Sequence, residues 1–195
     1  EGGDEEYLSR ADVPRFDLYL SFTGGPVLER LHRAFGARRP RALYCSVDPV
    51  SHRPCPSVVT WELGYLGTYA ADRQPALQTL LLDPARVLRT QRFVVAGAQY
   101  PQTVSWPQNL DRVSHLPPDG HAPFYCAQRF TLNLTRRTMV EAGYSPSVRL
   151  FEAAACGVPI MTDPWPGLAD FFTPDSEVLV VRTTHDAVQG LTMGA

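Results

Sequence analysis

The chain has 195 residues and a mass of 21.6 kDa, enough for one large domain or one domain and part of another. Hydrophobic residues make up 44% and charged residues 19%, which is typical of a folded globular protein. The net charge of −2 lacks the basic excess of a general nucleic-acid binder, and no apolar run approaches the roughly 20 residues of a membrane span. We therefore expect neither nucleic acid nor a bilayer as a partner.

All 18 basic residues are arginine, so a Schiff-base lysine and the lysine of a P-loop are both excluded. Any bound phosphate would be held by arginine, hydroxyl or backbone N–H groups. The four cysteines form no CxxC pair and no cluster with zinc-ligand spacing. This cysteine usage favours a reducing, cytoplasmic setting.

The first 47 residues predict a β-α-β unit. Residues 16–22 form a strand, residues 27–35 carry apolar side chains at helical spacing and end at Gly36, and residues 41–47 form a second strand. One such unit does not easily close a core, so we interpret residues 1–47 as the end of a preceding domain. Prolines then mark residues 48–61 as an interdomain linker.

Residues 62–195 predict a second domain, in which short apolar strands alternate with helices. This rhythm is typical of a parallel sheet covered on both faces, and six strands indicate an α/β, Rossmann-like, doubly wound fold. Its ligand crevice would lie at the carboxyl ends of the strands. The expected strands are residues 63–66, 92–96, 112–116, 130–134, 158–161 and 177–181.

The most informative segment is AGYSPSVRLFEAAACGVPIMTDPWPG, residues 142–167. Ser145 is a suitable N-cap, Pro146 suits the first helical position, and Gly157 suits the end of the helix. The first turn would present the N–H groups of Ser147 and Val148, together with the positive end of the helix dipole. This arrangement predicts a phosphate site.

Glu152 follows on the same helical face as Arg149. An acid behind an anion-binding helix start can accept hydrogen bonds from ribose hydroxyls, whereas the alternative is a surface ion pair between Arg149 and Glu152. Earlier in the chain, Gly67 ends a strand and Arg73 opens the following helix. These two residues indicate a close backbone approach to a phosphate, and the alternative is a tight turn with a solvated arginine.

The motif Ser147-x-x-x-x-Glu152-Ala-x-Ala-x-Gly157-x-Pro159 resembles the donor-site signature of GT-B-fold glycosyltransferases related to family 4. The strings LGYLGTYAADRQP, RFVVAGAQYP and FEAAACGVPIMTDPWPGLADFF are similar to the CgeB-like (spore maturation protein) glycosyltransferases. The resemblance runs from about residue 17 onward. It implies two Rossmann-like domains, with a nucleotide-sugar donor, UDP by preference, held mainly by the C-terminal one.

Residue by residue, the resemblance implies that Glu152 binds the ribose. Backbone from Ser145 to Arg149 and at Gly67 would cradle the diphosphate with Arg73, and His115 and Leu116 would meet the base. Tyr144 stands where many relatives carry a sugar-contacting glutamate. No metal or cofactor is implied, since a DxD motif is absent. The catalytic residues and the acceptor are not identified.

Two other readings remain open. The chain could be a non-catalytic nucleotide-sugar-binding or structural module, which the short N-terminal unit and Tyr144 favour. It could also be a nucleotide-sugar epimerase of GT-B fold, although no pair of carboxylates in the crevice can be named for that chemistry. A hydride-transferring Rossmann enzyme is disfavoured because the glycine fingerprint is missing.

Overall fold

A computed structural model describes residues 10–193, which form a six-stranded sheet and a separate two-stranded sheet. All strands of the larger sheet are parallel, in the order β5-β4-β3-β6-β7-β8. The strands are β3 (Trp61–Leu66), β4 (Phe93–Ala96), β5 (Leu110–Val113), β6 (Gln128–Asn133), β7 (Ile160–Thr162) and β8 (Leu179–Val180). This order is the doubly wound Rossmann arrangement, so the predicted fold is confirmed.

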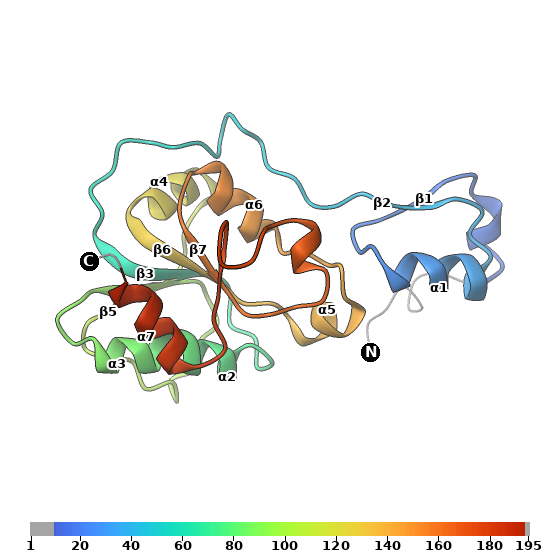
Figure 1. Cartoon of the computed structure of the whole chain (residues 1–195). Coiled ribbons are helices and arrows are strands. Elements are labelled where there is room, and N and C mark those ends of the chain that lie inside the picture. Colours follow the sequence, from blue (N-terminus) through green and yellow to red (C-terminus); the bar gives the residue numbers. More distant parts are fainter. Residues whose placement is uncertain (1–9, 194–195) are drawn as a thin grey trace.

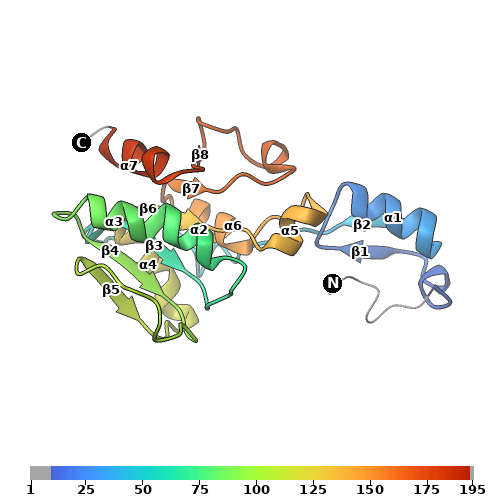
Figure 2. The same ribbon diagram turned by 90° about the horizontal axis from the view of Figure 1, so that it is seen from below.

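Helices cover both faces of the six-stranded sheet (Figures 1 and 2). On one face lie α2 (Gln74–Leu77), α3 (Asp83–Val87) and α7 (Thr184–Thr192), and on the other lie α4 (His121–Cys126) and α6 (Val148–Ala155). The short helix α5 (Arg137–Ala142) was not expected from the sequence. Short 3₁₀ turns are formed by Val13–Arg15, Pro118–Gly120 and Leu168–Asp170.

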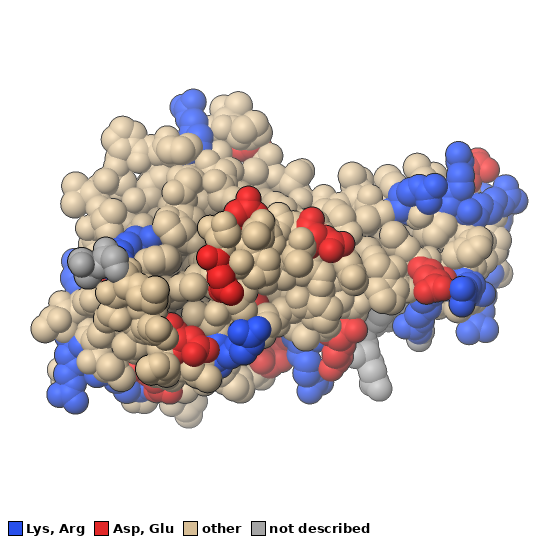
Figure 3. Space-filling view, viewed as in Figure 1, with Lys and Arg blue, Asp and Glu red and all other residues tan. Residues whose placement is uncertain are grey.

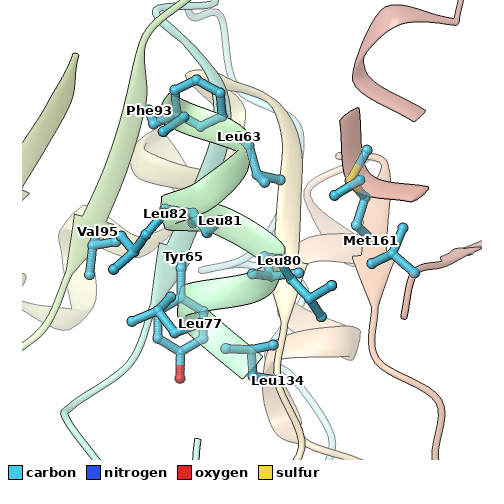
Figure 4. Close-up of a cluster of buried hydrophobic side chains, with 14 of the residues drawn as sticks. Leu63, Tyr65, Leu77, Leu80, Leu81, Leu82, Phe93, Val95, Leu134 and Met161 are labelled. Atoms are coloured by element: carbon cyan, nitrogen blue, oxygen red, sulfur yellow. The ribbon is translucent and has the colours of Figure 1, made fainter. Parts of the chain in front are cut away.

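The main hydrophobic core lies between the sheet and the α2–α3 face (Figure 4). A π-helical turn, Gln78–Leu82, joins α2 to α3 and makes one continuous helical segment from Gln74 to Val87. Three successive leucines of this turn, Leu80, Leu81 and Leu82, are buried against the strands. A second core packs α4 and α6 on the opposite face, around Tyr125, Leu150 and Ile160.

The N-terminal unit is the predicted β-α-β: β1 (Tyr19–Ser21), α1 (Pro26–Phe35) and β2 (Pro40–Ala42), with the two strands parallel. Gly36 ends α1 with a left-handed φ of 71°, which a glycine adopts without a Cβ clash. The small core of the unit consists of Val13, Leu31, Phe35 and Ala37. Large apolar side chains of the unit stay exposed: Phe16, Leu18, Leu20, Phe22 and Leu43. Two strands bury too little surface to shelter them.

Residues 43–60 contain no helix or strand and cross from the N-terminal unit to β3, passing over the α4 and α6 side of the larger domain (Figure 1). On the face shown in Figure 3, arginines gather over the N-terminal unit, while much of the larger domain is uncharged. Within residues 10–193, none of the helices has both the length and the apolar character needed to cross a bilayer.

The leucines of the π-helical turn give a test of the packing. Replacing Leu81, which is fully buried, by alanine is expected to lower the free energy of unfolding by about 2–5 kcal/mol, since it removes core contacts and leaves a cavity. Val87→Ala, at an exposed position at the end of α3, serves as the control and is expected to change it by less than about 0.5 kcal/mol. Urea unfolding followed by circular dichroism measures both. Equal effects of the two substitutions would contradict the described core.

Candidate functional site

The larger sheet has one topological switch point, between β3 and β6. The chain leaves β3 for the α2 face and leaves β6 for the opposite face, so the connections after the two strands diverge. Ligands of sheets of this kind bind in a crevice at this position. A hydrogen bond holds the two loops at this point, because Asp72 Oδ2 accepts from the backbone N–H of Arg137 at 3.0 Å. The two loops at the switch point therefore have a defined position relative to each other.

Arg73 lies at the crevice, immediately before α2, and its side chain is only 5% exposed. Its Nη2 donates to the carbonyl oxygen of Thr68 at 2.7 Å, while its buried Nε has no partner among the described residues. Burial, the main cause, lowers the pKa of Arg73, and the nearby charges of Arg149 and Arg136 lower it further. The alternative of a solvated arginine is wrong. This cluster, in which the charges of two guanidinium groups act on a third, favours an anion as ligand.

Arg149 joins this cluster from the first turn of α6. Its guanidinium carbon lies 5.5 Å from the ring centre of Tyr65, a buried residue near the end of β3, and its Nη1 donates to Ser147 Oγ at 3.0 Å. The surface ion pair between Arg149 and Glu152 that helical spacing also allows is not formed among the described residues. Arg136, in the loop after β6, escaped the sequence analysis because only the fold brings it near Arg73.

The predicted start of α6 needs a correction. The N-cap is Ser147 and not Ser145, and the helix begins at Val148 rather than Pro146. Ser145 is buried, and its Oγ accepts a hydrogen bond from Thr23 Oγ1 of the N-terminal unit at 3.2 Å, so a tertiary contact occupies the group that would cap the helix. The Ser147 side chain caps no N–H of the first turn. The half-exposed start of α6 therefore keeps N–H groups for an anion.

Tyr144 connects the two parts of the molecule. Its φ of 48° is left-handed, its carbonyl oxygen accepts from the N–H of Gly24 at 2.9 Å, and its N–H donates to the carbonyl oxygen of Pro166 at 2.7 Å. The ring packs so closely on Gly25 that a Cβ there would lie 2.3 Å from Tyr144 Cδ2. Tyr144 thus contacts the start of α1 as well as bordering the candidate site.

Glu152 lies in the middle of α6, and its side chain is only 13% exposed. Its Oε2 accepts a hydrogen bond of 2.8 Å from Tyr125 Oη of α4. Its Oε1 lies 3.8 Å from Nε2 of His52, a residue of the segment between the two sheets. Burial, more than the neighbouring Glu152, raises the pKa of Tyr125, which stays a hydrogen-bond donor at neutral pH. The Glu152 carboxylate is therefore fixed through Oε2 by Tyr125, while Oε1 is not bonded to that tyrosine.

The remaining predicted residues follow two strand ends of the larger sheet, those of β3 and β5. Gly67 follows β3, and its carbonyl oxygen accepts from Tyr100 Oη at 3.0 Å, while a Cβ on it would lie 2.5 Å from Tyr65 Oη. Gly67 thus fits closely between two tyrosines. His115 is exposed just after β5, and Leu116 packs on the Val94, Ala96 and Phe124 cluster.

A family profile described as Glycosyl transferase-like matches residues 73–193. Comparison with curated protein sequences gives no match. Among solved structures, sucrose-phosphate synthase from Thermosynechococcus elongatus is similar with a TM-score of 0.64 and 14% identity over 97% of this chain and 53% of that one. The Anabaena protein HepE in complex with UDP-glucose has a TM-score of 0.65 and 12% identity over 96% of this chain and 58% of that one.

A third similar structure is the pneumococcal O-GlcNAc transferase GtfA in complex with UDP and GlcNAc. Its TM-score is 0.65 and its identity 12%, over 97% of this chain and 39% of that one. At these identities the likeness shows the shared fold. This chain spans about half the length of the first two of these structures, or less in the third.

The contact of Tyr144 with Gly25 is open to a direct test. Gly25→Ala is expected to destabilise the attachment of the N-terminal unit by about 1–3 kcal/mol, because φ is +53° and the new methyl group meets the Tyr144 ring. Thermolysin cleavage near the exposed Val58 and Val59 should then become faster. Gly120→Ala is the control, since its φ is −84° and the nearest atom belongs to the mobile end of Leu116. Unchanged cleavage in Gly25→Ala would exclude the contact.

Proposed function

Because the chain belongs to the Glycosyl transferase-like family, we propose that its six-stranded domain binds a nucleotide-sugar donor in the crevice between β3 and β6. The observation that carries the proposal is the cluster of Arg73, Arg149 and Arg136 beside the uncapped start of α6. The donor is a nucleoside diphosphate sugar, and UDP is the favoured nucleotide. Two of the similar structures, HepE and GtfA, are complexes with UDP-glucose and with UDP and GlcNAc.

The diphosphate is assigned to the positive end of the crevice. Arg73 is already fixed by its bond to Thr68 and keeps Nε–H without a partner, so an anion supplies the acceptor that the protein does not. Arg149 and the first N–H groups of α6, around Ser147 and Val148, complete a surface of donors. A preorganised set of this kind stabilises the negative charge that develops on a departing nucleoside diphosphate. The transfer is therefore expected to proceed without a metal ion.

The nucleoside is assigned to the α4 side of the same crevice. Glu152 lies one turn beyond Arg149 along α6, and its Oε1 is free to accept from ribose hydroxyls while Oε2 stays bonded to Tyr125. His115 and Leu116, which follow β5, border the place assigned to the base, and Gly67 and Tyr144 border the place assigned to the sugar diphosphate. Each part of the donor thus has a chemically matched neighbour.

The wider assignment is also a proposal. We place the chain among the CgeB-like relatives of family 4 and expect it to act in the cytoplasm. Residues 1–47 are the end of an acceptor-side domain, residues 48–61 the linker and residues 62–195 the donor domain; of these, residues 1–9 and 194–195 lie outside the described part. The chain spans about half of the first similar structures. Sugar transfer by the chain itself is therefore also a proposal.

The carboxylate gives the first test of the donor site. Titration of the purified chain with UDP, GDP and dTDP by calorimetry is expected to show binding of one nucleotide, UDP. Glu152→Gln should weaken it about 10- to 100-fold, since it removes a charged acceptor worth about 1.5–3 kcal/mol. Glu29→Gln, on the exposed face of α1, is the control. Thermal unfolding verifies that each variant is folded, and failure of a folded chain to bind any nucleotide would overturn the proposal.

The arginines give a second, independent test. Arg149→Ala is expected to weaken UDP binding about tenfold or more and the binding of uridine much less, because the guanidinium is assigned to the diphosphate. Arg89→Ala, at an exposed position after α3, is the control. Equal losses for UDP and uridine would contradict the placement of the diphosphate at Arg149, although not the binding of a nucleotide elsewhere in the crevice.

A further inference from the structure

Three potential metal ligands meet where the segment between the two sheets crosses the larger domain. They are His52 of that segment, His121 at the start of α4 and Glu152 of α6, and one ligand atom of each lies within 4.8 Å of the others. We propose that these three side chains bind a divalent transition-metal ion and that zinc fits them best.

The state of His52 is the first argument. Its side chain is 15% exposed, yet both ring nitrogens are buried and form no hydrogen bond within the described residues. Buried polar atoms are ordinarily hydrogen-bonded, and an unpaired one indicates a bound water molecule or ion. The backbone holds His52 in place, since its N–H donates to the carbonyl oxygen of Asp48 at 2.9 Å. An ordered imidazole with unused nitrogens is a suitable ligand.

The arrangement of the partners is the second argument. His52 Nε2 lies 3.8 Å from Glu152 Oε1, and the rings of His52 and His121 have centres 6.3 Å apart at an interplanar angle of 62°. Ligand atoms at about 2.0–2.2 Å from a tetrahedral zinc ion lie roughly 3.3 Å from one another. Because the three ligand atoms lie within 4.8 Å of one another, rotations that shorten their separations by up to about 1.5 Å complete the set.

The hydrogen bond from Tyr125 is the third argument. It holds Glu152 Oε2 at 2.8 Å and leaves Oε1 beside His52, 3.8 Å from its Nε2. Ligating carboxylates are commonly oriented by such an outer hydrogen bond. Two imidazoles and one carboxylate are a recurrent zinc set that leaves a fourth position for water or another ligand. Spacing along the chain gives no sign of it, because the three residues come from distant segments.

The proposed metal has a structural consequence. An ion held by these residues joins the segment of residues 43–60 to both helices on one face of the domain. It also uses the carboxylate that the donor site requires. The metal and the nucleotide then exclude one another, and this part of the inference rests on the proposed function.

The test is a zinc titration of the full chain after removal of metals with EDTA, followed by calorimetry and by thermal unfolding. One equivalent of zinc is expected to bind and to raise the Tm. His52→Ala and His121→Ala should each weaken binding more strongly than Tyr125→Phe, for which about a tenfold loss is expected from an outer-shell change. His185→Ala, a histidine of α7 outside the cluster, is the matched control and should bind as the unaltered chain does.

Thiols also bind zinc, so the cysteines need a control of their own. Cys126 ends α4, the helix that begins at His121, and its Sγ accepts a hydrogen bond from the backbone N–H of Cys55 at 3.4 Å. Cys126→Ser is expected to leave zinc binding unchanged, and cobalt in place of zinc should show no thiolate charge-transfer band. Absence of zinc binding by the folded chain, or binding that survives both histidine variants, overturns the proposal. Competition between zinc and UDP is measured separately. Zinc binding without UDP binding would refute the donor site alone, and the reverse would refute the metal site alone.

Discussion

The reversal of strand order between β3 and β6 is the constraint on which the rest of the molecule depends. Parallel strands end at the same edge, and at this one point their connections leave toward opposite faces, so backbone does not close over the strand ends. Arg73 is buried at this edge despite the cost of removing a charge from water. The carbonyl oxygen of Thr68 offsets part of that cost by accepting a hydrogen bond from Nη2, whereas Nε has no partner among the described residues.

The start of α6 is held by tertiary contacts rather than by its own capping residue. Tyr144 and Ser145 contact Gly24, Gly25 and Thr23 of the N-terminal unit, and the helix begins three residues after Ser145. The N–H groups assigned to the diphosphate therefore occupy a place set partly by the N-terminal unit. A change in the orientation of that unit would move these N–H groups, so the proposed donor binding is expected to be coupled to the position of the unit.

Periodicity was sufficient to predict the parallel sheet, because strands buried on both faces are apolar throughout, as Phe93–Ala96 is. Local signals also located the end of α1 at Gly36. The predicted N-cap of α6 was wrong, because Ser145 satisfies the local rules for an N-cap and yet bonds to Thr23, 122 positions earlier. Arg136 and His52 were missed for the same reason: only the folded chain brings them to Arg73 and Glu152. Local chemistry predicts elements, whereas pairs distant in sequence require the fold.

Glu152 shows how one carboxylate can be suited to two kinds of ligand. It is mostly buried, and it contacts a tyrosine donor at 2.8 Å and an imidazole at 3.8 Å. A buried carboxylate is stabilised most by a nearby positive charge, and next by several hydrogen bonds to its free oxygen. A cation at the histidines supplies the charge, and a ribose supplies neutral donors while the arginines bind its phosphates. Because both proposed ligands require Oε1, we expect the relative concentrations of metal and nucleotide to decide which one is bound.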